Sequence, residues 1–318
     1  MANEKDRPRI VVIGAGAVGG FYGAIAHRAG AHVALVLRSD VETVRQHGLI
    51  VDSPLGDLSF APAAVHGPDD EPVPGADYVV CCVKVLPTVD RASLIAPWVG
   101  PDTTVVLIEN GIDIEPEIAS ALPDHELLSG LAFVGVSRLG PGRIRHQAFG
   151  RLTLGAWPAG TTPALSALAA LFETGGIDVK ISETIVRERW AKSLWNAPFN
   201  PISVLADGTD TDTMLGVPGG EALVRGVMAE VAAVAAADGH PMPDDAAERN
   251  IAATRQMTAY RNSMALDHRA GRPLEIDAIL GNIVDIAARL DVPVPRLAGL
   301  RALVAMKTRE AERAATGS

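Results

Sequence analysis

The chain has 318 residues, of which 48% are hydrophobic and 21% charged, and its formal net charge is -10. This length exceeds that of one ordinary small domain, so we expect two domains with sizeable cores rather than a disordered chain. The acidic balance, with both signs of charge interleaved, argues against broad electrostatic capture of nucleic acid or an anionic membrane surface. We therefore expect a small-molecule partner bound through local positive charge, and neither nucleic acid nor a membrane.

Targeting and redox signals are sparse. The first residues, MANEKDRPRI, are polar and lack the apolar core of a signal peptide, and no stretch of membrane-spanning length is free of charge, Gly and Pro. The only cysteines, Cys81 and Cys82, are neighbours within an apolar run. Because no Cys-x-x-Cys motif lies nearby, we expect structural thiols rather than a redox pair, in a cytoplasmic protein.

Short apolar runs alternate with segments of helical pattern in the first half of the chain. The runs expected to be strands are Ile10–Ile13, His32–Leu37, Tyr78–Val83 and Thr104–Ile108. Each is almost continuously apolar, which is typical of strands covered on both faces of a parallel sheet. The segments 16–28 and 88–99 suit crossover helices. The pattern predicts an α/β fold that begins with a Rossmann-like doubly wound sheet.

The character of the sequence changes twice in the second half. Residues 127–157 are rich in Gly, Val and alternating polar residues, and we expect them to add antiparallel strands. From Glu183 onward, Ala, Leu, Glu and Arg recur at helical spacing, which indicates a mostly α-helical carboxy-terminal domain. We therefore expect a cofactor-binding domain over residues 1–182 and a helical substrate-binding and catalytic domain over residues 183–318.

A glycine-rich motif follows the first predicted strand directly. Its candidate cofactor-binding residues are Gly14, Ala15, Gly16, Ala17, Val18 and Gly19. In dinucleotide sites the first glycine permits a tight turn, the second lets the backbone approach a pyrophosphate, and the third lets the helix pack on the strand. The helix amino terminus offers unpaired N–H groups to the phosphates. Glycines of plain turns can spell the same motif, but the strand before and the helix after favour a nucleotide site.

The end of the second predicted strand bears on the choice between NAD and NADP. NAD sites place an acidic side chain there, on the ribose 2′-hydroxyl. Here Arg38 occupies the strand end, and the nearest acid, Asp40, lies two residues further on. A guanidinium suits a 2′-phosphate, and Lys84, after another predicted strand, lies toward the same edge of the crevice. We expect NADP(H) as cofactor; the alternative is that Arg38 and Lys84 are solvated surface cations.

Three polar residues recur every four positions in an otherwise apolar segment of the second half. They are Lys192, Asn196 and Asn200, which lie on one face of a helix. On spacing alone, an exposed helix face is as good an interpretation. The apolar neighbours, among them Trp195 and Phe199, leave little of this helix for solvent. We therefore interpret the stripe as a candidate active site.

Further motifs occur in order along almost the whole chain. They are Asn110-Gly111, Gly142-Arg143-Ile144-Arg145-His146, Gly150-Arg151-Leu152, Asn262-Ser263-Met264 and Gly271-Arg272-Pro273-Leu274-Glu275-Ile276-Asp277. Together with the Lys-x-x-x-Asn-x-x-x-Asn-Pro helix after a Rossmann half, this series resembles the ketopantoate reductase (2-dehydropantoate 2-reductase) family. Each motif alone is modest evidence for the family, but the order in which the motifs occur is specific to it.

The resemblance implies roles for two charged residues. Lys192 would be the general acid that protonates the substrate's ketone oxygen as hydride reaches the carbon. A carbonyl that becomes an alkoxide needs a cationic donor aimed at its oxygen, which a lysine can provide. Glu275 would complete the pocket by a hydrogen bond to Lys192 or to a substrate hydroxyl. The alternative for Glu275 and Asp277 is the first turn of a helix opened by Pro273, where carboxylates are favourable without any active site.

The resemblance also implies four uncharged residues in the site. Asn196 and Asn200 would orient the substrate, Ser263 would bind its carboxylate, and Asn110 would hold the nicotinamide or the reacting carbonyl. Ser263 equally suits a helix cap. No His, Cys and carboxylate cluster has metal-ligand spacing, so we expect no metal.

The chain departs from the family pattern in several places. Pro87 stands where the family commonly has Gln, and Glu109 precedes the Asn-Gly pair where Gln is usual. Pro198 interrupts the polar stripe and removes a helix hydrogen bond. Residues 205–213 are more acidic than the resemblance leads us to expect. These departures leave the cofactor chemistry intact and bear on the identity of the substrate.

The leading hypothesis is NADPH-dependent reduction of 2-dehydropantoate to pantoate, a step that feeds pantothenate biosynthesis. The first alternative is a reductase or dehydrogenase of another 2-oxo or hydroxy acid. The second is a regulatory module that binds NADP(H) without turnover, although such a module has no need of a Lys and Asn stripe. The sequence leaves a homodimer open.

Overall fold

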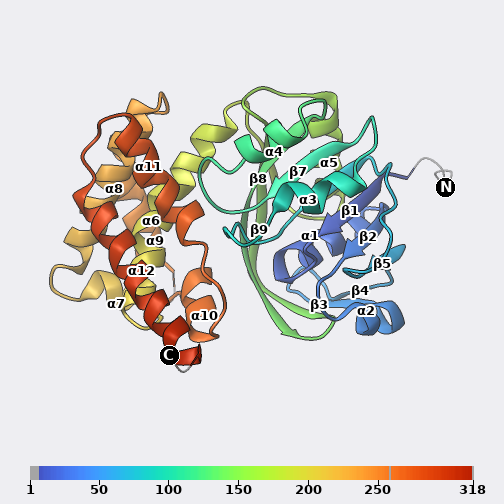
Figure 1. Cartoon of the computed structure of the whole chain (residues 1–318), viewed down its shortest axis with the longest axis horizontal. Helices are drawn as coiled ribbons and strands as arrows, with labels where there is room; N and C mark the ends of the chain where they lie inside the picture. Colours follow the sequence, from blue (N-terminus) through green and yellow to red (C-terminus); the bar gives the residue numbers. More distant parts are fainter. Residues whose placement is uncertain (1–6, 258, 317–318) are drawn as a thin grey trace. The chain divides into compact units, whose positions relative to one another are not determined.

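The computed structural model describes residues 7–257 and 259–316, and its chain divides into two compact units (Figure 1). The first unit contains the chain up to Lys84, Val89–Asn110 and Ile114–Ile185. The second contains Val85–Thr88, Gly111–Asp113 and the chain from Val186 onward. Two short segments of the amino-terminal half therefore pack with the carboxy-terminal helices.

The first unit is built on one sheet in the strand order β4-β3-β9-β8-β7-β6-β1-β2-β5, with β10 paired to β9. The strands are β1 (Arg9–Ile13), β2 (His32–Val36), β3 (Leu49–Asp52), β4 (Leu58–Phe60), β5 (Ala64–His66), β6 (Tyr78–Cys81), β7 (Thr104–Ile108), β8 (Leu127–Gly140), β9 (Arg143–Ala156) and β10 (Val179–Ile181). From β5 through β8 all pairings are parallel. The predicted doubly wound sheet is confirmed.

Helices cover both faces of this sheet, which explains the continuous apolar runs of its central strands. On one face, α1 (Ala17–Arg28) and α5 (Pro163–Thr174) pack over a core that contains Val33, Leu35 and Val106. The other face is covered by α3 (Arg91–Ile95), a 3₁₀ turn (Ala96–Trp98) and α4 (Pro116–Ala121). Alternate side chains of each strand thus enter different cores.

The structure refines several predicted elements. The antiparallel addition over residues 127–157 is the long β8–β9 hairpin, although β8 itself continues the parallel sheet from β7. The helix expected over residues 88–99 begins only at Arg91, where Asp90 caps it, and becomes a 3₁₀ turn that contains Pro97. The short strands β3, β4 and β5 were not predicted, because three or four residues carry too little periodicity.

The two cysteines lie at the end of β6. Cys81 is buried in the sheet, and the backbone N–H of the partly buried Cys82 donates to the Ile13 carbonyl over 2.9 Å. Both thiols are free. Burial raises the pKa of each thiol well above its ordinary value, and the nearby Glu109 raises it further. The expectation of structural thiols fits this environment.

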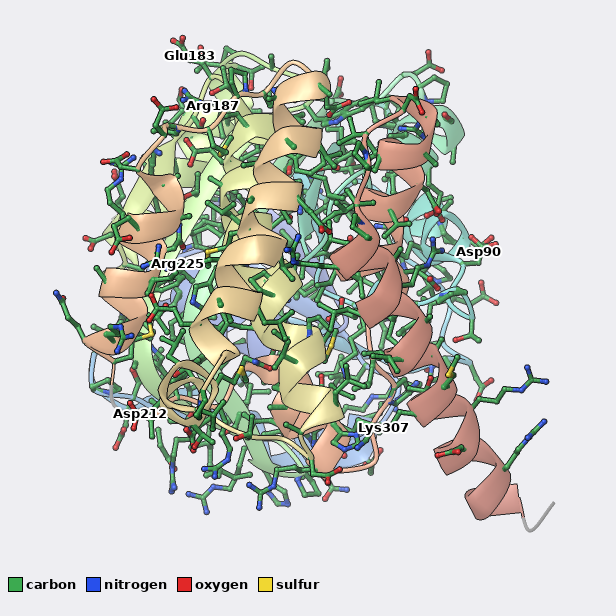
Figure 2. The ribbon with its side chains drawn as sticks, turned by 90° about the vertical axis from the view of Figure 1, so that its left-hand side faces the viewer. Asp90, Glu183, Arg187, Asp212, Arg225 and Lys307 are labelled. Atoms are coloured by element: carbon green, nitrogen blue, oxygen red, sulfur yellow. The ribbon has the colours of Figure 1, made fainter. Side chains whose placement is uncertain are left out.

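The second unit is helical. Its helices are α6 (Ile185–Leu205), α7 (Thr211–Gly216), α8 (Gly220–Ala237), α9 (Ala246–Arg255), α10 (Ser263–Arg269), a π-helical turn (Asp277–Gly281), α11 (Asn282–Arg289) and α12 (Pro295–Thr316). Trp190, Phe199 and Met228 lie in its main core, and Lys307 of α12, labelled in Figure 2, pairs with Asp207 at 2.6 Å. Within the described residues, no helix combines the length and apolarity needed to cross a membrane.

A buried ion pair secures the chain after β7. Arg91 Nη1 donates to Glu109 Oε2 over 2.7 Å, and both side chains are at most 2% exposed. The same guanidinium reaches the Ile114 carbonyl at 2.7 Å and Glu117 at 2.5 Å. Arg91 therefore holds the chain on both sides of the segment 110–113. Glu109, which departs from the family pattern, has a specific partner in this chain.

We expect Arg91→Met to lower the free energy of unfolding by about 3–5 kcal/mol, because it leaves the buried Glu109 carboxylate without its cation. Arg91→Met combined with Glu109→Gln should recover much of this loss. Urea denaturation measures both. Arg9→Met is the matched control, since Arg9 pairs with Asp77 at the surface over 3.5 Å and such pairs contribute less than about 1 kcal/mol. Equal losses for the Arg91 and Arg9 variants would contradict the interpretation.

Candidate active site

The glycine turn lies between β1 and α1, and β1 pairs with β2 on one side and with β6 on the other. Gly14 has φ +79, and a Cβ atom at this residue would lie 2.6 Å from Val83 Cγ1. A Cβ atom at Gly19 would lie 2.6 Å from the Gly14 carbonyl oxygen. The first and third glycines are therefore required by the turn itself and by the approach of α1 to β1, as the motif predicts.

Gly16 has a different environment. The nearest atom to a Cβ built on it is the Gly14 carbonyl oxygen, at 4.0 Å. This glycine is thus not required by packing within the described chain, and its open side leaves room for a ligand to approach the backbone. Gly16 is also the N-cap residue of α1, and no side chain caps that helix. The amino terminus of α1, which begins at Ala17, therefore has backbone N–H groups that no side chain caps, and such groups suit a pyrophosphate.

The candidate cations of the first unit lie beyond strand ends. Arg38 is exposed and follows β2 by two residues, whereas Lys84 is partly buried and lies three residues past β6, which ends earlier than expected. Asn110 is partly buried and lies two residues past β7. Because β2, β6 and β7 run parallel, these residues follow the carboxyl edge of the sheet, where α/β folds bind ligands.

The predicted polar stripe lies on α6 in the second unit. Lys192 is partly buried, while Asn196 and Asn200 are buried. Pro198 does not end the helix, since α6 runs unbroken from Ile185 to Leu205. Asn200 is 2% exposed, and its Oδ1 has no hydrogen-bond partner among the described residues. The stripe is therefore not the solvated helix face that its spacing also allowed.

The Lys192 amine has an unusual electrostatic environment. Its pKa is lowered from 10.5 to about 7: burial is the largest cause, the neighbouring Arg189 guanidinium lowers the pKa as well, and the Glu275 carboxylate raises it. Arg189 lies one helical turn before Lys192 and is itself 1% exposed, with Nη1 donating to the Gly111 carbonyl over 3.0 Å. A lysine with this pKa can exchange its proton near neutral pH, as general acids and bases do.

Glu275 approaches Lys192 from a loop end rather than from a helix. The chain is helical from Ile276 and not from Pro273, so the first-turn alternative is wrong for Glu275, whereas Asp277 does lie in the first turn. Its Oε1 accepts from the Val85 backbone N–H over 3.0 Å, and its carbonyl accepts from Ile279 N at 3.1 Å. The Val85 N–H thus holds the side chain, and the Ile279 N–H holds the backbone of the same residue.

A buried network connects α6 to the start of α10. Asn262 caps α10 by accepting from Ala265 N over 2.8 Å, and its Nδ2 donates to the Phe199 carbonyl over 3.1 Å. Ser203 Oγ donates to the Asn200 carbonyl over 2.6 Å. Ser263 is the first residue of α10 and is exposed. Because Asn262 is the cap, the capping role considered for Ser263 is taken by its neighbour.

The structure also draws attention to two residues to which the sequence assigned no role, although Asn262 belongs to the motif Asn262-Ser263-Met264. Arg189 and Asn262 lie in or beside the candidate site, and only Asn262, as an Asn three residues before Ala265, carries a local capping signal. Among the described residues, no group of three or more His, Cys, Asp or Glu side chains is arranged to hold a metal ion.

Comparison with known proteins places these features in a family. The model of the family described as "Ketopantoate reductase PanE/ApbA" matches residues 10–159, and that of its carboxy-terminal domain matches residues 184–308. A 2-dehydropantoate 2-reductase from Nostoc sp. is 34% identical over 93% of this chain and 92% of its own.

Solved structures agree with the sequence comparisons. The 2-dehydropantoate 2-reductase of Methylococcus capsulatus has a TM-score of 0.89 and 48% identity over 96% of this chain and 97% of its own. A D-mandelate dehydrogenase complex with NADH has a TM-score of 0.86 at 22% identity over 95% of this chain and 99% of its own, which shows a shared fold. The chain belongs to the ketopantoate reductase family, whose members are NADP-dependent oxidoreductases acting on a CH–OH group.

Proposed function

We propose that the chain reduces 2-dehydropantoate to pantoate with NADPH and that Lys192 is the general acid. The observation that carries this proposal is the pKa of the Lys192 amine. Burial and the neighbouring Arg189 lower it to about 7, although the Glu275 carboxylate raises it. Relatives named 2-dehydropantoate 2-reductase at 34% and 48% identity support the substrate. The proposal requires that this amine reach the substrate's ketone oxygen beside the nicotinamide.

The proposed chemistry assigns a separate task to each charged group. The chemistry that NADPH would supply, when bound, is a hydride for the carbonyl carbon. The Lys192 ammonium donates a hydrogen bond to the carbonyl oxygen and then transfers its proton as negative charge develops there. Glu275 favours the protonated amine before the reaction, and Arg189 favours release of the proton. Together with burial, which is the largest cause, these opposed effects give the amine a pKa of about 7, so near neutral pH it can both keep and transfer a proton.

Substrate orientation is proposed for the polar residues around Lys192. Asn196 and Asn200 lie one and two turns further along the same face of α6. Asn200 Oδ1, a buried acceptor without a partner among the described residues, suits the hydroxyl group of 2-dehydropantoate. Ser263 at the start of α10 is proposed to bind the carboxylate, and Asn110 to hold the nicotinamide or the carbonyl.

Cofactor binding is proposed for the first unit. The turn residues Gly14 to Gly19 and the uncapped amino terminus of α1 fit the pyrophosphate. Arg38, and with it Lys84, would pair with the 2′-phosphate that distinguishes NADP(H) from NAD(H).

Lys192→Ala should lower kcat/KM for 2-dehydropantoate by about 10²- to 10⁴-fold, the usual contribution of a general acid. The rate is followed by the loss of NADPH absorbance, with several other 2-oxo acids assayed in parallel. Lys180→Ala removes an exposed lysine of β10 and is the matched control. A Lys192→Ala variant with the wild-type rate would remove the proposed mechanism, and indifference of the wild type to 2-dehydropantoate would remove the proposed substrate.

The pH dependence follows from the lowered pKa of Lys192. Only the protonated amine can donate, so kcat/KM for reduction should be level below pH 7 and fall by about tenfold per pH unit above it. Glu275→Gln removes the anion that raises this pKa, and the falling limb should therefore move to lower pH. Steady-state rates over a buffer series measure the shift; a limb at unchanged pH in the Gln variant would refute the coupling.

Arg38→Gln should reduce the preference for NADPH over NADH by about tenfold or more, because a charge-assisted hydrogen bond to the 2′-phosphate is lost. The measurement is the ratio of kcat/KM for the two cofactors at fixed 2-oxo acid. Arg45→Gln is the control, since Arg45 on α2 (Val41–His47) pairs with Asp70 and lies in the same unit. Equal use of the two cofactors by the wild type would defeat the proposed cofactor assignment.

A further inference from the structure

A shallow, solvent-open hollow lies beside the glycine turn, within the first unit. Its lining comes from the turn, from the end of β2, from α2 and β3, and from the β8–β9 hairpin. The lining residues relevant to charge and nucleotide binding are Ala15, Gly16, Leu37, Asp40, Arg138 and Arg143. The hollow therefore joins the expected pyrophosphate position to the expected position of the adenosine ribose.

Asp40 is the acidic residue of this hollow. It follows β2 by four residues, has φ +67 and is the N-cap residue of α2. Its carboxylate pairs with Arg138 Nη2, and its Oδ2 also lies 3.4 Å from the backbone N of Gly142. The Asp40 side chain is 14% exposed, against 46% for Arg138. Two groups of the β8–β9 hairpin thus engage this carboxylate from across the hollow.

The charge of Asp40 matters for the choice of cofactor. A carboxylate near the end of the second strand accepts a hydrogen bond from the 2′-hydroxyl of NAD(H) and repels the 2′-phosphate of NADP(H). In this chain Arg138 compensates that charge, and Arg143 adds a second guanidinium to the same lining. The Asp40 carboxylate therefore accepts hydrogen bonds from the protein itself and is not available to accept one from a ribose hydroxyl.

The geometry points to Arg138 as a specificity-determining residue that makes the hollow acceptable to the 2′-phosphate by engaging and neutralising Asp40. This inference rests on the proposed preference for NADP(H). The β8–β9 hairpin lies outside the cofactor motifs, and the inference gives it a part in cofactor selection. The two ends of the ion pair come from residues 98 positions apart, so the selection depends on the fold and not on a local motif.

Arg138→Gln tests the inference through cofactor affinity, which requires no substrate. Titration with NADP⁺ and with NAD⁺, followed by calorimetry, gives the two dissociation constants. We expect the constant for NADP⁺ to rise by roughly tenfold, because an uncompensated carboxylate then faces the phosphate, and that for NAD⁺ to stay constant or fall. A parallel loss of affinity for both cofactors, or an unchanged ratio, would overturn the inference.

Two further variants separate charge compensation from a merely structural role. Asp40→Asn combined with Arg138→Gln removes both charges and should restore most of the affinity for NADP⁺; no recovery would overturn the inference. Arg145→Gln removes a guanidinium of the same hairpin that lies outside the hollow's lining and 4.0 Å from Asp52. It should leave the ratio unchanged, and a shift equal to that of Arg138→Gln would also overturn the inference. A wild type that binds NADP⁺ selectively but does not reduce 2-dehydropantoate would refute the proposed substrate alone.

Discussion

The proposed chemistry depends on two cations that share one turn of a largely buried helix. Arg189 and Lys192 are three residues apart on α6, and placing two positive charges together away from water is unfavourable. The Arg189 guanidinium donates to the Gly111 carbonyl, and the pKa of the Lys192 amine is lowered, first by burial and then by this neighbouring cation. Glu275, fixed by the Val85 backbone N–H, limits that shift. Burial, one cation and one carboxylate therefore act together on how readily the amine keeps its proton.

Much of the first unit could be predicted from the sequence because its signals are local. Continuous apolar runs predict strands covered on both faces, and the spacing of Gly14, Gly16 and Gly19 predicts the turn that follows β1. The Lys and Asn stripe was predicted by four-residue spacing within an apolar segment. The strands β3, β4 and β5 were missed because their few residues carry no clear alternation, and their pairing depends on partners elsewhere in the sheet.

The residues around the site to which the sequence assigned no role both contact partners that are distant in the sequence. Arg189 reaches Gly111, and Asn262 reaches Phe199, so neither contact has a signature within one segment. The start of the helix after Glu275 was also placed wrongly, because Pro273 is a favourable first residue but the chain becomes helical only at Ile276. The local residue preferences were enough to predict a helix here, but the residue at which the helix begins depends on tertiary contacts.

The two adjacent cysteines have a consequence for how the protein meets oxidants. The thiolate, not the thiol, attacks peroxides and alkylating reagents, and the interior of the sheet disfavours the thiolate at both Cys81 and Cys82. Neither sulfur lies on the Lys192 helix, and the chain has no other cysteine. Direct oxidation or alkylation at these two positions is therefore disfavoured while the sheet is folded.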